Sequence, residues 1–227
     1  PALASKPVYR LVSEMAFKGP FAYILDEPNL CVLDRADYKL NDQPWQGEKE
    51  ILKVDQAIRR ELGMDLRGGE MLQPWFTGLQ EHPVKAELSL RFSFEIETMP
   101  SEITLLMERP ELFAITVNDM PLDSGVVTGW MIDTCLKTLP IPTDGLKMGE
   151  NIIELKVGFH HGINLEAIYL VGPFGVKVED TRCSLTILPE TLAIGDVTQQ
   201  GLPFYSGRIH YKLPLPEFKK KEAALLL

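Results

Sequence analysis

The chain has 227 residues, of which 45% are hydrophobic and 24% charged, and its 32 acidic and 23 basic side chains give a formal net charge of -9. Such a chain is ordinary in composition and long enough for one good core or two small ones. No apolar run approaches the roughly 18 residues that a membrane-spanning helix needs, and phosphate recognition requires clustered basic residues that this acidic chain lacks. We therefore expect neither a membrane nor a nucleic acid as a partner.

The first part of the chain is expected to contain a short strand and a small helical insertion. A strand is expected at 30–33, and residues 45–79 are expected to form a small helical insertion between two strands. Within it, Asp55 is expected to cap a short helix at 56–62 that stops at Gly63, and 67–75 is expected to give a second helical turn. The insertion would cover an edge or an open face of the sheet structure.

The strongest local pattern is the alternation of apolar and polar residues from Val84 to Glu97. The apolar members of this series are Val84, Ala86, Leu88, Leu90, Phe92, Phe94 and Ile96. A period of two over this length predicts a long strand with one buried face. Strands at 103–107 and 112–117 are expected to follow as successive antiparallel neighbours, and turn chemistry follows at Asn118–Pro121.

The remainder of the chain repeats this alternation of short strands and turns. A strand rich in β-branched residues is expected at 152–159, and further short strands are expected at 130–136, 167–171, 176–178, 184–188 and 208–213. Many strands separated by Gly and Pro turns, without alternating helices, predict an all-β, jelly-roll-like antiparallel sandwich.

Residues 1–180 are expected to make one sandwich. The segment 181–227 would either close the same sandwich or begin a truncated second one, because a weak hydrophobic repeat relates it to residues about 120 positions earlier. The first residue is Pro1 and the chain ends in the apolar segment Ala223–Leu227. We therefore expect the sequence to be a piece of a longer protein.

Motifs for catalysis and for cofactors are missing from the sequence. The chain has no Gly-x-Ser-x-Gly elbow, phosphate loop or dinucleotide fingerprint. His160 and His161 are adjacent, and neighbouring side chains of a strand point to opposite faces, so we expect no metal there unless the chain turns. The sequence therefore predicts no catalytic residue, no metal site and no cofactor.

The three cysteines lie far apart in the sequence, at Cys31, Cys135 and Cys183. Their odd number and wide spacing fit neither a disulfide framework nor a zinc site. This usage favours a reducing compartment such as the cytoplasm.

Aromatic residues beside polar ones are the candidates for a binding site. Sugars offer C–H faces that stack on aromatic rings, and they offer hydroxyls that carboxylates can bind in bidentate fashion. The candidate sugar-binding residues are Trp130 with Asp133, Trp75 and Tyr205. Packing of these aromatics in a core or an interface remains the alternative.

Six short stretches resemble one known group of domains: LDRADY at 33–38, RGGEMLQPW at 67–75, GWMID at 129–133, GENIIEL at 149–155, LEAIYLVGPFG at 165–175 and GLPFYSG at 201–207. They resemble the C-terminal galactose-binding-like β-sandwich region of large bacterial glycoside hydrolases, most nearly the α-L-rhamnosidase-like and family-2-like enzymes. The resemblance implies a non-catalytic accessory module whose partner is the catalytic barrel domain of the same parent chain. Sandwiches of this kind bind sugars through loops at one end or brace the barrel.

The sequence thus favours a carbohydrate-associated accessory domain of a larger bacterial glycoside hydrolase, which would not be an enzyme by itself. Two alternatives remain open at this point. One is a purely structural sandwich without a ligand site, and the other is a small glycosidase in its own right.

Overall fold

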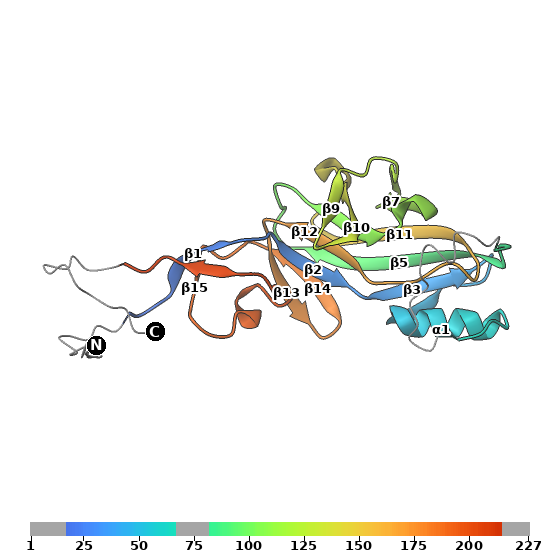
Figure 1. Ribbon diagram of the computed structural model, residues 1–227, viewed down its shortest axis with the longest axis horizontal. Helices are drawn as coiled ribbons and strands as arrows, with labels where there is room; N and C mark the ends of the chain where they lie inside the picture. Colours follow the sequence, from blue (N-terminus) through green and yellow to red (C-terminus); the bar gives the residue numbers. More distant parts are fainter. Residues whose placement is uncertain (1–16, 67–81, 215–227) are drawn as a thin grey trace, which may run out of the picture.

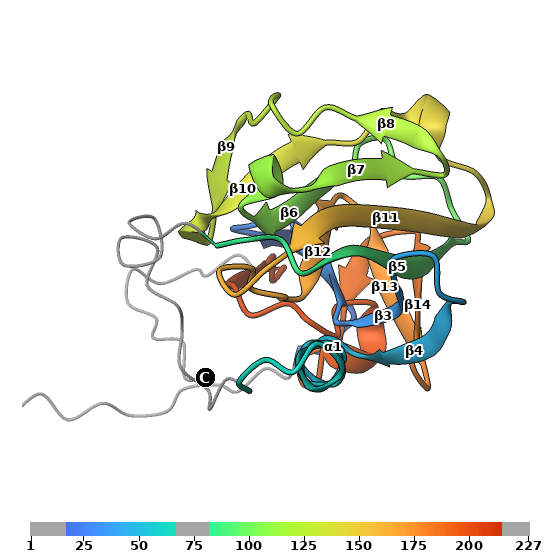
Figure 2. The ribbon, with the colours of Figure 1, turned by 90° about the vertical axis from the view of Figure 1, so that its right-hand side faces the viewer.

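Two β-sheets enclose one apolar core in the computed structural model, which describes residues 17–66 and 82–214 (Figures 1 and 2). The core joins buried residues of both sheets, such as Leu105 and Leu170 of one and Phe92 and Ile153 of the other. Almost all strand pairs are antiparallel, and the parallel pair joins β5 and β14. The prediction of an all-β sandwich is confirmed.

The five-stranded sheet has the order β2-β12-β6-β10-β9. Its strands are β2 (Asn29–Leu33), β6 (Thr104–Glu108), β9 (Gly129–Met131), β10 (Asp133–Pro140) and β12 (Ile168–Gly172). The eight-stranded sheet follows the order β13-β14-β5-β11-β7-β8, with β3 paired to β5 and β4 paired to β3. Its strands are β3 (Arg35–Leu40), β4 (Gln46–Glu50), β5 (Ala86–Ile96), β7 (Ala114–Val117), β8 (Met120–Leu122), β11 (Gly149–Phe159), β13 (Gly175–Glu179) and β14 (Arg182–Thr186).

The long strand expected from the alternation at 84–97 is β5, and this prediction is confirmed. β5 pairs with β11 without a break from Ala86 opposite Phe159 to Ile96 opposite Gly149. Phe92 and Phe94 of β5 face the core and are at most 2% exposed. The outward positions of β5 carry polar side chains, which form part of the cavity described below.

The strands that follow β5 are not neighbours of one another, contrary to the sequence-based expectation. β6 pairs with β10 and β12 in the five-stranded sheet, whereas β7 pairs with β11 and β8 in the eight-stranded sheet. The chain therefore crosses from one sheet to the other at each of the two connections. The apolar face of a strand can be buried in either sheet of a sandwich, because the inner faces of both sheets form the same core. The apolar pattern of a strand therefore does not decide which sheet the strand joins.

The expected strand at 130–136 is also two strands rather than one. Ile132, with a φ of 69°, makes a tight reversal between β9 and β10. A β-bulge between Asp133 and Lys137 then shifts the register of the pair. The hairpin turn at Asn118 and Asp119 is found where it was expected, between β7 and β8, with φ values of 49° and 67°.

The helix of the expected insertion begins earlier than predicted, at Ile51 rather than at residue 56. The first residues of the insertion form β4, and α1 spans Ile51–Glu61. The N-cap is Glu50, whose carboxylate accepts hydrogen bonds from the backbone N–H groups of Leu52 and Lys53. Asp55 was expected to cap the helix but lies inside it, buried against Arg59. The second helical turn expected at 67–75 lies outside the described residues.

α1 packs beneath β3 and β4 (Figure 1). Three short 3₁₀ turns complete the helical content of the described residues: η1 (Pro110–Leu112), η2 (Thr143–Gly145) and η3 (Thr198–Gln200).

A third, small sheet projects from one end of the sandwich (Figure 1). It consists of β1 (Phe21–Leu25), β15 (Thr191–Leu192) and β16 (Ile209–Tyr211), with β1 in the middle. The beginning and the end of the described chain therefore lie side by side. β14 belongs to the eight-stranded sheet, and the boundary proposed at residue 180 stays a prediction. The segment Ala223–Leu227 lies outside the described residues.

Candidate functional site

A gap in the eight-stranded sheet creates a cavity lined mainly by polar side chains. One edge of β5 is covered along its whole length by β11. The other edge is shared, because β3 pairs with residues 88–91 and β14 pairs with Glu95 and Ile96. Residues 92–94 therefore have no strand partner on that edge. A cavity of about 210 Å³ lies beside this gap, and we call it the gap cavity.

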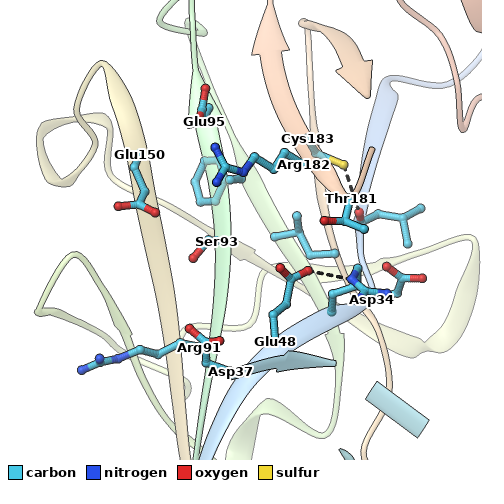
Figure 3. Close-up of a pocket in the computed structure, with 14 residues that line it drawn as sticks. Asp34, Asp37, Glu48, Arg91, Ser93, Glu95, Glu150, Thr181, Arg182 and Cys183 are labelled. Atoms are coloured by element: carbon cyan, nitrogen blue, oxygen red, sulfur yellow. Dashed lines mark hydrogen bonds and ion pairs between the residues drawn. The ribbon is translucent and has the colours of Figure 1, made fainter. Parts of the chain in front are cut away.

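Side chains from six strands, namely β2, β3, β4, β5, β11 and β14, line the gap cavity (Figure 3). The acidic ones are Asp34, Asp37, Glu48, Glu95 and Glu150, and the basic ones are Arg35, Arg91 and Arg182. Five carboxylates against three guanidinium groups leave an excess of two negative charges. Ser93, in the middle of the gap, and Thr181 add hydroxyl groups. The remaining lining residues are Val32, Leu33, Phe94 and Cys183.

Two of the three arginines are held in ion pairs. Arg35 Nε donates to Glu48 Oε1 across 2.7 Å. Arg91 Nε donates to Glu154 Oε2 of the neighbouring strand β11 across 2.8 Å. The guanidinium carbon of Arg91 also lies 3.9 Å from the centroid of the Trp45 ring, a cation–π contact that holds the arginine flat against the indole. These contacts fix the orientation of two donors at the cavity wall.

Arg182 differs from the other two arginines. It is exposed, comes directly after the turn between β13 and β14, and makes no ion pair with any described residue. In Figure 3 its side chain reaches from β14 toward the gap. Its guanidinium group can therefore donate hydrogen bonds to a ligand without first breaking an ion pair.

The carboxyl group of Asp37 has a changed proton affinity. Burial and the negative charge of Glu48 raise the pKa of Asp37 above its usual value, with a smaller contribution from Glu150, although Arg91 opposes the change. The neighbouring Glu154 behaves in the opposite way. Burial alone would raise the pKa of Glu154, but the hydrogen bonds from Arg91 and Lys156 outweigh burial and lower it. Asp37 is thus a partly desolvated carboxyl group of the cavity that lies near a second negative charge, that of Glu48.

This arrangement suits a ligand with many hydroxyl groups. Carboxylates accept hydrogen bonds from pairs of hydroxyls, and guanidinium groups donate to hydroxyl and ring oxygens. Polar groups fixed by ion pairs lose little conformational freedom on binding.

The predicted sugar-binding residues lie away from the gap cavity. Trp130 and Asp133 flank the reversal between β9 and β10 on the five-stranded sheet, and Trp130 is 57% exposed. Asp133 Oδ1 accepts a hydrogen bond from the backbone N–H of Cys135, and this bond lowers the pKa of Asp133. Trp75 lies outside the described residues.

Tyr205 lies in a second cavity, of about 570 Å³, where the five-stranded sheet meets the small terminal sheet. Met131 and Ile132 line this cavity, and Trp130 and Asp133 do not. The structure thus brings Tyr205 close to the β9–β10 reversal without placing all three candidates in one site. The Tyr205 hydroxyl donates to the carbonyl of Arg208 across 2.8 Å.

Sequence reasoning missed the residues of the gap cavity. The alternation in β5 correctly assigned Arg91, Ser93 and Glu95 to the outward face. The approach of Asp37 and Arg182 to that face depends on which strands share the β5 edge, and the sequence contains no local signal for this.

The adjacent histidines lie at a turn, because the Ile163 N–H donates to the His160 carbonyl. The His160 ring stacks on His82 with a centroid separation of 5.5 Å. Within residues 17–66 and 82–214, no group of three or more His, Cys, Asp or Glu could hold a metal ion. In the same ranges, no helix has both the length and the apolar character needed to cross a membrane.

Comparisons with known proteins give a partial structural similarity. No protein-family model and no curated protein matches the sequence. Part of the fold is similar to the crystal structure of a β-D-mannosidase from Dictyoglomus thermophilum, with a TM-score of 0.38 and 15% identity. This match covers 66% of the present chain and 23% of that chain. A TM-score this low carries no weight for function, so the functional argument depends on the cavity and its residues.

Proposed function

We propose that this chain is a carbohydrate-binding accessory domain of a larger bacterial glycoside hydrolase, and that the gap cavity is its sugar site. The observation that carries the proposal is the gathering of five acidic and three basic residues around a gap in the sheet. The resemblance of six stretches to accessory sandwiches of glycoside hydrolases supports the same function. The catalytic barrel domain of the parent chain would be the partner, and this domain would contribute no catalytic residue.

The charges of the cavity favour a neutral sugar over an acidic one. The excess of carboxylates would repel the carboxylate of a uronic acid. Hydroxyl groups, in contrast, can donate to Asp37 and Glu150 and accept from Arg182. We therefore expect neutral sugars such as galactose or rhamnose to bind and glucuronate to bind more weakly.

Isothermal titration calorimetry with galactose, rhamnose, glucuronate and neutral plant oligosaccharides tests the proposal. We expect heat of binding for at least one neutral sugar, and a loss of affinity of about tenfold or more in Arg182→Ala because charged hydrogen bonds contribute about 1.5 to 3 kcal/mol. Arg109→Ala, which removes an exposed arginine outside the cavity, is the matched control and should bind normally. No response to any sugar at millimolar concentration would overturn the proposal.

The same titration separates the two cavities. Trp130→Ala and Tyr205→Phe should leave binding unchanged if the sugar occupies the gap cavity. A loss of binding in these variants with normal binding in Arg182→Ala would instead assign the sugar to the second cavity. Turnover of an aryl glycoside by the purified chain would show that it is an enzyme and would contradict the accessory role.

A second candidate function is bracing of the catalytic domain without any ligand. It is favoured by the exposed apolar residues at the free edge strand β9 and in the segment before it, namely Val126, Val127, Trp130 and Ile132, which are 57%, 40%, 57% and 67% exposed. Exposed apolar clusters commonly mark protein interfaces. Under this alternative, the chain would self-associate in sedimentation velocity, Trp130→Ser would reduce this association, and no sugar would bind.

A further inference from the structure

Two buried thiols from opposite sheets lie in contact in the core. Cys31 of β2 is fully buried and Cys183 of β14 is 8% exposed. Both are free thiols, and they are neighbours, since each side chain shifts the pKa of the other. Cys183 Sγ also lies 3.7 Å from the carbonyl oxygen of Val32, the residue that follows Cys31. The pair thus spans the sandwich from the five-stranded to the eight-stranded sheet.

Only one member of the pair faces the gap cavity. Cys183 lines this cavity and Cys31 does not. Figure 3 shows Cys183 beside Arg182 at the cavity wall, with its contact to the β2 backbone drawn as a dashed line. A small reagent in the cavity therefore meets Cys183 and not Cys31.

The two thiols differ in access as well as in proton affinity. The neighbouring Cys183 and burial raise the pKa of Cys31, and the neighbouring Cys31 lowers the pKa of Cys183. A thiolate is the attacking species in thiol–disulfide exchange. Because Cys183 lines the gap cavity and Cys31 is fully buried, Cys183 is the thiol that reacts first, and Cys31 resolves the product.

We propose that Cys31 and Cys183 form a redox-active pair that a small-molecule disulfide converts into a disulfide bridge between the two sheets. The Cys183 thiolate attacks the disulfide RSSR, forms a mixed disulfide and releases one RS⁻. Cys31 then loses its proton and attacks the Cys183 sulfur, which releases the second RS⁻. Overall, two protein thiols are oxidised by two electrons, and RSSR is reduced to two thiols.

The bridge would tie together two walls of the gap cavity. Residues 32–35 form one wall and residues 181–183 form the other. Since a bridge between positions 31 and 183 closes a loop of well over a hundred residues, the bridged chain should melt on the order of 10 °C higher than the reduced chain. A thiol reductant should reverse the effect.

The third cysteine supplies an internal control. Cys135 is exposed, but burial of its sulfur and its hydrogen bonds to Asp133 and Glu108 raise the pKa of its thiol to about 12. The Cys135 thiol remains protonated at neutral pH and should react slowly despite its exposure.

The test treats the folded chain with 2-hydroxyethyl disulfide and maps the products by mass spectrometry. We expect a peptide pair joined through Cys31 and Cys183, a chain lighter by two hydrogen atoms, and a higher melting temperature. Cys135→Ser should behave like the unaltered chain. Cys31→Ser should stop at a mixed disulfide on Cys183, and Cys183→Ser should leave Cys31 unmodified.

Peptide mapping of the unaltered chain tests whether Cys31 and Cys183 form the bridge, even if a serine variant fails to fold. Recovery of free Cys31 and Cys183 from folded protein, when the same reagent modifies both in the unfolded chain, would overturn the proposal. So would modification confined to Cys135, or mixed disulfides at Cys31 and Cys183 that never proceed to a bridge.

Discussion

Arg59 Nε donates to Asp55 Oδ2 across 2.7 Å, one turn earlier in α1, and both residues are buried beneath the helix. The same guanidinium group donates through Nη2 to the carbonyl of Ile163 and lies 5.3 Å from the centroid of the Phe159 ring. This arginine therefore connects the helix to the end of β11 and to the loop that follows it. The ion pair lies within the helix, and it is the contacts of Arg59 with Ile163 and Phe159, together with the buried apolar residues of α1, that hold the helix to the sandwich.

Replacing Arg59 with Met should destabilise the protein strongly. The substitution leaves the Asp55 carboxylate buried without its partner, a change that typically costs about 3 to 5 kcal/mol. Urea unfolding measures the loss. Arg60→Met, which changes the exposed neighbour of the same type, is the matched control and should shift the free energy of unfolding by no more than about 0.5 kcal/mol.

The double variant Asp55→Leu/Arg59→Met extends this prediction. Because it removes both charges together, it should be more stable than Arg59→Met alone. Equal losses in the two variants would show that the arginine contributes through packing and its bond to Ile163 rather than through the ion pair.

A second pair of polar residues, Asn151 and Asn118, forms a hydrogen-bond network near the start of β11. Asn151 is fully buried, and its Oδ1 accepts from Asn118 Nδ2 across 2.8 Å and from the Lys147 N–H across 3.0 Å. Its Nδ2 donates to the carbonyls of Lys147 and Gly149. Asn151→Leu should cost about 3 kcal/mol, because several buried groups would lose a partner at once.

Thermal or urea unfolding measures this effect, and a double-mutant cycle with Asn118→Ala isolates the bond between the two amides. A coupling free energy near zero would contradict a direct contribution from that bond. The cycle also reports on the β7–β8 hairpin, since Asn118 occupies its turn.

Local patterns predicted many of the strands, although not β1, β3 and β4, and they did not predict which strands pair. The alternation around Phe92 and Phe94 predicts β5 because only a half-buried strand has a period of two. Pairing depends on contacts between residues far apart in the sequence, so the crossing of the chain after β5 left no local signal. The start of α1 was misplaced for a related reason. Glu50 and Asp55 are both carboxylates that can cap a helix, and burial beside Arg59 places Asp55 inside it.

The gap cavity illustrates the same limit for function. Arg91 and Glu95 were assigned correctly to an outward face, but an outward polar face is common to most sandwiches. The cavity arises because β3 and β14 share one edge of β5 without meeting. The aromatic candidates Trp130 and Tyr205 were selected for their chemistry alone, and the structure places them on a different surface.

Gly172, the last residue of β12, lies close to the backbone of Glu102. A Cβ atom at this position would lie 2.6 Å from the carbonyl oxygen of Glu102, which is backbone and cannot move aside easily. Gly172→Ala should therefore destabilise the protein by about 1 to 3 kcal/mol. Gly47→Ala, where no atom lies within 4 Å of the added Cβ, is the matched control. Equal melting temperatures for the two variants would contradict this reading of the contact.

His160 should make the stability of the protein depend on pH. Burial lowers the pKa of His160 below its ordinary value of 6.5, and the positive charges of His82, Arg109 and His161 lower it further. The unfolded chain therefore binds a proton at this position at a higher pH than the folded chain does. The resulting stability is complete well above pH 6.5 and decreases as the pH falls through 6.5 to the lower pKa of the folded state.

The free energy of unfolding should thus decrease for the unaltered chain between about pH 7.5 and about pH 5.5, and less so for His160→Gln, which cannot titrate. The effect of this one residue should be modest, because the ring is partly exposed and solvent screens the neighbouring charges. Urea unfolding at the two pH values measures both chains. Identical slopes would mean that the stacked contact with His82 leaves the proton affinity of His160 unchanged on folding.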